Sequence, residues 1–300
     1  MIAFWNRLGI PVMIGGLALS GGVNAQEGEG QPALTTRTDA IADAETAIAP
    51  VRRVSELFKG EVRGPGDEEK IASIKDLILD GQGAPHYVLI TRGGVAGLGG
   101  ETIAVPFEVA RLTYVEDGGW RLTLEMTGEQ LAQAPTLEEG SLAPLRDRSW
   151  LQANRQFFGA NPAGNDSGTG DESFLFRASA LKDAQVRGAG GDESIANVDD
   201  LLLDDDFRAT FAILGFGGIA GLGKEQVPVP FDRLRLDSEE DGGRSVLIVR
   251  SDTTKERLQS ETAPRLDGEY NRMLDPTFVE RVREYFGAID PGAAGLERRP

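Results

Sequence analysis

The chain carries one segment twice, and this internal duplication constrains its fold more than any other feature. Shifting the sequence against itself by 124 positions aligns residues 53–119 with residues 177–243 without a gap. Of these 67 aligned positions, 30 are identical. Because this repeat is too long for one unit of a solenoid, each copy is expected to form an independent domain with its own core.

The positions shared by the two copies are mostly turn residues and apolar residues. The matching runs are Val62-Arg63-Gly64 with Val186-Arg187-Gly188, Leu79-Asp80 with Leu203-Asp204, Ala96-Gly97-Leu98-Gly99 with Ala220-Gly221-Leu222-Gly223, and Val105-Pro106-Phe107 with Val229-Pro230-Phe231. Since loop lengths and apolar spacing were both retained, the two copies are expected to share one topology.

Within each copy, residues alternate with the period of a β-strand. The apolar face of one predicted strand is Ile103, Val105 and Phe107 in the first copy and Val227, Val229 and Phe231 in the second. Pro228 and Pro230 fall on the opposite face, which favours an edge or solvent-facing strand because proline has no N–H to donate. Other β-rich runs span residues 87–92, 120–124, 211–216 and 246–249.

Two longer segments, residues 71–80 and 195–204, change phase midway. This pattern predicts a bulged strand, or two short strands that bend around a barrel. Many short strands, glycine-rich turns and no alternating helices predict a mainly β fold with two tandem small β-barrels rather than a parallel sheet.

Each predicted barrel is followed by an amphipathic helix. Asp275 is a good N-cap, Pro276 suits the first helical position, and Gly287 ends the pattern; in the first copy the helix follows Asp147 and ends at Gly159. The apolar stripes are Phe278, Val279, Val282, Tyr285 and Phe286, and Trp150, Leu151, Phe157 and Phe158. Such stripes must be buried, either against their own barrel or against a partner or the other domain.

These residues resemble a known family. The order Val-Arg-Gly, Leu-Ile-Leu-Asp, Gly-Gly-Val-Ala-Gly-Leu-Gly and Val-Pro-Phe is similar to that of the PRC-barrel domain, over residues 51–126 and 177–250. The family was named for the H subunit of the photosynthetic reaction centre and also occurs in a ribosome maturation factor. The resemblance implies a six-stranded barrel that serves as an assembly or docking module and has no known catalytic residues.

The N-terminus has the pattern of a secretory signal. Arg7 precedes an apolar run from residue 8 to residue 19, and small residues follow up to Ala25, after which cleavage is expected. An uncleaved membrane anchor is the alternative, but the run is shorter than the ~20 residues of a spanning helix. The mature chain is therefore expected to be soluble and periplasmic or secreted, which disfavours ribosome maturation and a reaction-centre role.

These patterns divide the chain into six parts. The predicted boundaries are a signal peptide at 1–25, a flexible arm at 26–50, a first barrel with its helix at 51–160, a linker at 161–175, a second barrel with its helix at 176–289 and a flexible tail at 290–300.

The chain is acidic and contains no cysteine. Its formal net charge is −17, and −18 once Arg7 leaves with the signal peptide. Such a surface repels phosphate backbones and anionic lipid headgroups, which excludes nucleic acid and membrane surfaces as expected partners. Without cysteine the fold has no disulfides, so packing alone must stabilise it.

The glycine-rich loops are the predicted docking elements. Val95 and Leu98 in the first copy, and Ile219 and Leu222 in the second, place apolar side chains on a glycine-rich backbone. Either these loops fold back and plug the end of the barrel, or they project and dock a partner.

Three other motifs carry little chemistry. Residues 218–225 imitate a phosphate-binding loop, but Glu225 stands where a hydroxyl must reach magnesium. Asp199, Asp200, Asp204, Asp205 and Asp206 lack the spacing of a calcium loop and favour a solvated acidic turn. His86 is the only histidine and is expected on a strand, half exposed to solvent.

We therefore expect a non-catalytic protein with no metal, no cofactor and no catalytic residue, whose two barrels dock a protein partner in the cell envelope. A cation-sensing or small-molecule-sensing pair of domains that uses the acidic turns is the alternative. An enzyme based on paired carboxylates would need a deep cleft, which a barrel this small seldom encloses.

Overall fold

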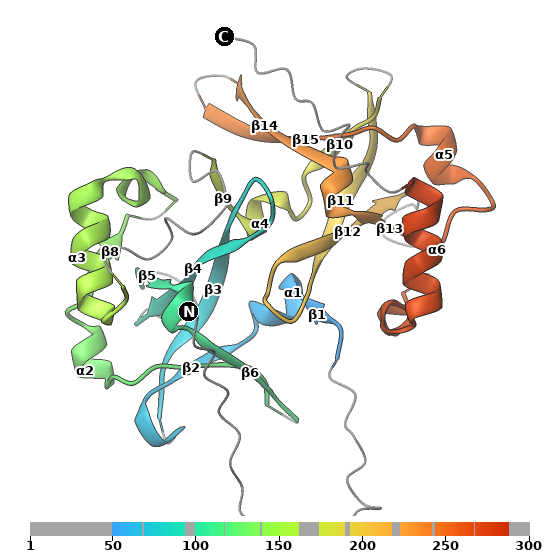
Figure 1. The fold of residues 1–300 in the computed structure, drawn as a ribbon. Helices are drawn as coiled ribbons and strands as arrows, with labels where there is room; N and C mark the ends of the chain where they lie inside the picture. The colour runs from blue at the N-terminus through green and yellow to red at the C-terminus, as the bar shows by residue number, and fades with distance from the viewer. Residues whose placement is uncertain are drawn as a thin grey trace, which may run out of the picture. The chain divides into compact units, whose positions relative to one another are not determined.

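The computed structural model describes residues 50–67, 69–93, 100–116, 118–138, 140–161, 174–189, 193–217, 223–241, 244–266 and 268–287 (Figure 1). All of them belong to one compact unit. The predicted signal peptide, most of the arm, most of the linker and the tail lie outside the described residues. No helix within the described ranges is long and apolar enough to cross a bilayer.

The first copy forms a sheet in the order β6-β7-β2-β3-β4-β5-β8. Its strands are β2 Glu61–Arg63, β3 Lys70–Asp80, β4 Pro85–Arg92, β5 Glu101–Pro106, β6 Arg111–Val115, β7 Gly119–Thr123 and β8 Thr136–Leu137. The short helix α2 Gly128–Leu131 and the longer α3 Arg148–Phe158 follow β7. All of these strand pairs are antiparallel except β2 with β7, which are parallel.

The second copy repeats this order as β13-β12-β11-β10-β15-β14. Its elements are β10 Gln185–Arg187, β11 Ser194–Leu203, β12 Ala209–Phe216, β13 Glu225–Pro230, β14 Leu234–Asp241, β15 Arg244–Ser251, α5 Lys255–Gln259 and α6 Pro276–Phe286. The parallel pair is again the equivalent one, β10 with β15. The predicted mainly β fold, with one topology shared by both copies, is therefore confirmed.

The two copies exchange their first strands. In the first copy β1 Arg52–Arg53 leads into α1 Val54–Leu57, and β1 pairs antiparallel with β11 of the second copy. In return, β9 Leu175–Arg177 leads into α4 Ala178–Leu181, and β9 pairs antiparallel with β3 of the first copy. We call the contact between the copies the seam; Figure 1 shows α1 next to the β11–β12 hairpin and α4 next to β3.

The seam is part of the hydrophobic core. Leu57 of α1 and Leu181 of α4 are almost fully buried, and one continuous apolar cluster contains residues of both copies. The expectation of two independent domains is therefore wrong for the core, because each sheet is completed by a strand of the other copy. Two copies of one fold can exchange strands in this way because each copy has both the strand and the sheet edge that accepts it.

The predicted phase changes are β-bulges. The register between β3 and β4 shifts between Ile74 and Asp76, and the register between β11 and β12 shifts between Val198 and Asp200. A bulge turns the following side chain to the other face of the sheet. It thereby aims both aspartates at the seam.

The prolines of β13 do not face solvent. β13 lies at the end of the strand order, as predicted, but Pro228 and Pro230 are buried. Helix α6 packs on this strand and covers it. The alternative that Pro228 and Pro230 face solvent is wrong, because the trailing helix covers the strand.

Both trailing helices begin and end where the sequence predicted. Asp147 accepts hydrogen bonds from the backbone of Ser149 and Trp150, and Asp275 accepts one from the backbone of Thr277. Glycines follow the last residue of each helix. α3 packs on β5 and α6 on β13, so each helix covers part of its own barrel, which was one of the predicted alternatives.

Candidate binding site at the seam

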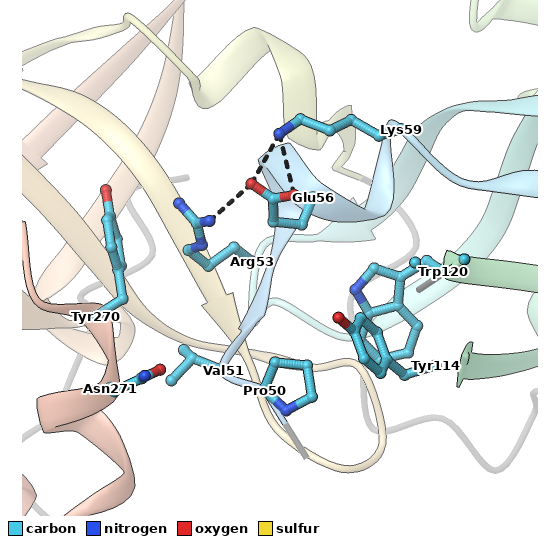
Figure 2. Close-up of a pocket in the computed structure, with 11 residues that line it drawn as sticks. Pro50, Val51, Arg53, Glu56, Lys59, Tyr114, Trp120, Tyr270 and Asn271 are labelled. Atoms are coloured by element: carbon cyan, nitrogen blue, oxygen red, sulfur yellow. Dashed lines mark hydrogen bonds and ion pairs between the residues drawn. The ribbon is translucent and has the colours of Figure 1, made fainter. Parts of the chain in front are cut away.

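A cavity of about 300 Å³ opens where the seam reaches the surface (Figure 2). Its lining residues are Pro50, Val51, Arg53, Glu56, Lys59, Tyr114, Gly118, Gly119, Trp120, Tyr270 and Asn271. We call this cavity the seam groove. Its lining comes from three segments: residues 50–59, the β6–β7 hairpin, and the short 3-10 helix Tyr270–Leu274 of the second copy.

The charged side chains of the seam groove come from α1 and its two ends. Arg53 Nη2 lies 2.7 Å from Glu56 Oε1, and Lys59 Nζ lies 2.9 Å and 3.0 Å from the two oxygens of the same carboxylate. One carboxylate therefore pairs with two cations. The groove carries an excess of positive charge on a chain whose formal net charge is −17.

Aromatic rings form the two walls. Tyr114 and Trp120 contact edge to face, with ring centroids 5.6 Å apart, and Tyr114 is 46% exposed. On the opposite wall the guanidinium of Arg53 lies 4.3 Å from the centre of the Tyr270 ring, a cation–π contact. Figure 2 shows the α1 side chains lying between these two walls.

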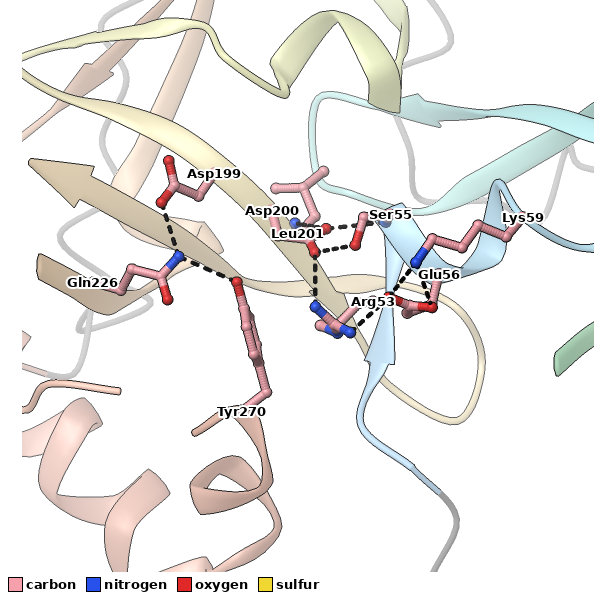
Figure 3. A network of polar contacts seen from close by, with 9 residues as sticks. All are labelled: Arg53, Ser55, Glu56, Lys59, Asp199, Asp200, Leu201, Gln226 and Tyr270. Carbon is pink, nitrogen blue, oxygen red and sulfur yellow. Dashed lines mark hydrogen bonds and ion pairs between the residues drawn. The ribbon is translucent and has the colours of Figure 1, made fainter. Parts of the chain in front are cut away.

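A polar network holds the groove from behind (Figure 3). Gln226 Nε2 donates to Asp199 Oδ2 at 2.9 Å and to the Tyr270 hydroxyl at 3.2 Å. Arg53 Nη1 lies 3.9 Å from Asp200 Oδ2. Tyr270 and Arg53 are thereby positioned by residues of the second copy's sheet, so the groove is built only where the copies meet.

Asp200 joins the two copies directly. It is buried and accepts hydrogen bonds from the backbone N–H of Ser55 at 3.1 Å, from the Ser55 hydroxyl at 2.5 Å and from the backbone N–H of Leu201 at 2.9 Å. Burial raises the pKa of Asp200, and the hydrogen bonds from Ser55 and Leu201 and the charge of Arg53 offset only part of that rise. The carboxylate caps the first turn of α1 from the other copy.

The equivalent contact occurs on the other side of the seam. Asp76 is buried and accepts hydrogen bonds from the backbone N–H of Ser179 at 3.0 Å, from the Ser179 hydroxyl and from the backbone N–H of Leu77 at 2.9 Å. Burial again raises the pKa of Asp76, against these hydrogen bonds and the nearby charge of Arg177. Two reciprocal caps therefore fasten the exchanged helices.

Aromatic residues distinguish the seam groove from its counterpart in the duplication. In the repeat, Tyr114 corresponds to Ser238 and Trp120 to Arg244. Lys59 corresponds to Asp183, which reverses the charge. The second copy therefore lacks these two aromatic side chains and this lysine at the equivalent positions.

His86 is buried, contrary to the half-exposed position expected for it. It is 8% exposed, and its Nε2 lies 3.1 Å from Asp80 Oδ2. Asp80 also accepts hydrogen bonds from the backbone N–H groups of Gln82 and Ala84. Burial raises the pKa of Asp80, but the hydrogen bonds from His86 and the two backbone groups outweigh it and hold the pKa below its ordinary value. The pair stabilises the β3–β4 turn.

The acidic residues near β11 have separate structural partners. Lys224 binds Asp199, Arg52 binds Asp205, and Asp204 accepts hydrogen bonds from the backbone of Asp206 and Arg208. Asp200 is buried, so the prediction of a solvated acidic turn is wrong for this residue. Among the described residues, no group of three or more histidine, aspartate or glutamate side chains is arranged to hold a metal ion.

The predicted docking loops cannot be compared with the structure. Val95, Leu98, Ile219 and Leu222 lie outside the described residues. Sequence reasoning missed the seam groove, since its lining comes from segments separated by more than 200 residues of the printed sequence, between Pro50 and Asn271. A signal was nevertheless present: Arg53, Ser55 and Asp76 each have an identical residue at the equivalent position.

The fold and the groove indicate a class of protein: two small barrels that share one hydrophobic core and have a cavity where they meet, at which a ligand or partner could bind. The PRC-barrel domain family matches residues 50–131 and 175–255. The chain therefore belongs to the PRC-barrel family, and the resemblance seen in the sequence is confirmed. No curated protein matches the chain. The tandem domains are consistent with a binding or assembly module.

Proposed function

We propose that this chain is an exported, non-catalytic assembly module that docks a protein partner through the seam groove. The observation that carries the proposal is the pairing of half-exposed Tyr114 with the stacked Arg53 and Tyr270 across one small cavity (Figure 2). The few residues that dominate the binding energy of protein interfaces are enriched in tyrosine, tryptophan and arginine.

The size of the cavity supports a side-chain anchor rather than a bound cofactor. Ligand pockets usually span about 300 to 1,000 Å³, and the seam groove, at about 300 Å³, lies at the small end of this range. A partner would insert one or two side chains between Tyr114 and Tyr270. The ion pairs of Glu56 with Arg53 and Lys59 hold the cations in place beforehand, which lowers the ordering cost of binding.

The glycine-rich loops form a second proposed contact. Val95 and Leu98, with Ile219 and Leu222, supply apolar side chains that suit a protein surface. Changing Leu98 and Leu222 to aspartate is expected to reduce partner capture while the fold remains intact, as measured by circular dichroism. Unchanged capture would remove these loops from the proposal and leave the groove untouched.

Partner capture by the full chain tests the groove. Tyr114→Ala is expected to reduce the amount of partner crosslinked and recovered from a native cell-envelope extract by about tenfold, since a central aromatic anchor contributes at least ~1.4 kcal/mol. Leu274→Ala is the matched control, because Leu274 is another large apolar residue with a similar exposure, 42%, and does not line the groove. Equal loss in both variants, or loss in neither, would contradict the proposal.

Export is tested separately. The N-terminal residue of the native protein recovered from the envelope fraction is expected to be Gln26, since the small residue Ala25 suits a signal peptidase. A native protein that begins before Arg7 and stays in the cytosolic fraction would exclude export and leave the binding proposal standing.

A further inference from the structure

Some seam contacts occur twice with the same residues. The two serine–aspartate caps, Ser55 with Asp200 and Ser179 with Asp76, are of this kind, and the backbone pairing of the exchanged strands also occurs twice. Because both copies carry the serine and the aspartate of the cap, and the strand pairing uses backbone groups, such contacts would form equally well between two first copies or between two second copies. They hold the seam together but do not choose which copies meet.

Other seam contacts occur only once, at the tips of two equivalent turns. The β3–β4 turn carries Gly83 with φ +79°, and the β11–β12 turn carries Phe207 at the equivalent position with φ +59°. This left-handed conformation suits glycine and strains an aromatic residue. A phenylalanine kept there indicates that its side chain has a compensating contact.

Phe207 fills an aromatic pocket in the first copy. Its ring lies 5.9 Å from the ring of Phe107 and 5.3 Å from that of Trp120, edge to face in both cases. The guanidinium of Arg52 lies 5.8 Å from the centre of the Phe207 ring. Phe207 is 7% exposed, so this pocket encloses it almost completely.

Gly83 meets the second copy with no room for a side chain. A Cβ atom at Gly83 would lie 2.9 Å from the carbonyl oxygen of Ala209, 3.0 Å from its Cβ and 3.0 Å from Cε1 of Phe231. Phe231 is the equivalent of Phe107 in the repeat. The first copy therefore offers a small tip and a wide pocket, and the second copy offers a large tip and a filled pocket.

We infer that Gly83 and Phe207 form a size match that makes the first copy pair with the second and excludes pairing of like with like between two chains. Two second copies would press Phe207 against Ala209 and Phe231, where even a methyl group does not fit. Two first copies would place Gly83 against Phe107 and Trp120 and leave the aromatic pocket empty. Specificity thus arises from a clash in one mismatch and a cavity in the other.

Two further one-sided contacts favour the same pairing. Arg52 forms an ion pair with Asp205 at 2.5 Å, whereas the equivalent residues are Phe176 and Gly81. The backbone N–H of Ala209 donates to the Gly83 carbonyl at 2.9 Å, and the equivalent donor position is Pro85, which has no N–H. The ion pair requires one copy of each kind, and the hydrogen bond is lost when two first copies pair.

Exchanging the two residues tests the inference in the full chain. In Gly83→Phe/Phe207→Gly, the first copies of two chains gain a matching tip and pocket, and so do the second copies, while the seam within one chain becomes mismatched. The variant is expected to form dimers between chains. Gly81→Ala, in the same turn, is the control, because its added Cβ lies 4.0 Å from its nearest neighbour, in Phe174.

Engineered disulfides report which copies have paired, since the chain has no cysteine of its own. Ile78 and Arg177 face each other in the register of the exchanged strands, so Ile78→Cys/Arg177→Cys links the two copies within one chain. Leu202 is the equivalent of Ile78 in the second copy. If the second copies of two chains pair with each other, Arg177 of one chain faces Leu202 of the other, so Arg177→Cys/Leu202→Cys links two chains only in that case.

With Gly83 and Phe207 in place, the first cysteine pair is expected to close within the chain, and the second is expected to stay reduced after refolding. The exchange should lower the first yield and raise the second by about tenfold each. Equal yields in both backgrounds would overturn the inference. If the exchange variant precipitates, Phe207→Gly alone is the test, because it removes the clash between second copies and adds no new one. In this variant the yield of dimers linked through Arg177→Cys/Leu202→Cys must increase. An unchanged yield of linked dimers overturns the inference.

Discussion

Replacing Asp200 with alanine removes one of the two carboxylates that fasten the copies together. The side chain accepts three hydrogen bonds, from the backbone N–H and hydroxyl of Ser55 and from the backbone N–H of Leu201, and it is 3% exposed. The alanine variant leaves both backbone donors buried without an acceptor, whereas the serine hydroxyl can rotate toward another partner.

The magnitude follows from those two donors. An unsatisfied buried hydrogen-bonding group costs about 1–3 kcal/mol, so two of them cost about 2–6 kcal/mol. Part of this is recovered, because burial raises the pKa of Asp200 and its ionised form is therefore held at some cost in the folded chain. We expect the free energy of unfolding to fall by about 2–4 kcal/mol.

Reversible unfolding in urea, followed by circular dichroism, measures this loss. Asp232→Ala is the control, because Asp232 is exposed and lies on the same copy. Ser55→Ala and the double variant complete a cycle, in which a coupling energy of at least ~0.5 kcal/mol is expected for residues in direct contact. A loss below ~0.5 kcal/mol for Asp200→Ala, or strict additivity with Ser55→Ala, would refute the reasoning.

Two other predictions concern the pH dependence of stability and steric crowding at Gly60. Burial raises the pKa values of Asp76 and Asp200 above the unfolded value, so the folded chain holds protons that the unfolded chain releases between these values. Stability should therefore fall as pH rises through that window, and unfolding of Asp76→Asn/Asp200→Asn should show a smaller slope; an equal slope would exclude the effect. Gly60→Ala should cost about 1–3 kcal/mol in the same urea assay, because its Cβ would lie 2.7 Å from the carbonyl oxygen of Trp120. A change within ~0.5 kcal/mol would count against this crowding.

Local patterns in the sequence predicted local structure correctly. The phase changes near Asp76 and Asp200 are bulges, and the trailing helices start at Asp147 and Asp275. These features depend on backbone chemistry within a few residues, such as capping by an aspartate or the pleat of a strand. The order of the repeated motifs predicted the family and the fold class correctly.

The seam could not be predicted because its contacts join distant segments. Nothing within β1 distinguishes a strand that pairs with its own copy from one that pairs with the other, since both choices bury the same side chains. The carboxylates of Asp76 and Asp200 were visible as shared residues, but acidic residues are usually exposed. Their burial depends on donors that the opposite copy supplies, at Ser179 and Ser55.

The strand exchange also sets the order in which the protein can be completed during synthesis. β3 lacks one of its partner strands until the ribosome has produced Arg177, and β1 waits still longer, until Leu203 has emerged. The first half of the chain must therefore remain unfinished while the second is being made. A cell that cuts or stalls the chain between the halves would be left with a sheet that has an open edge, which neighbouring chains can join.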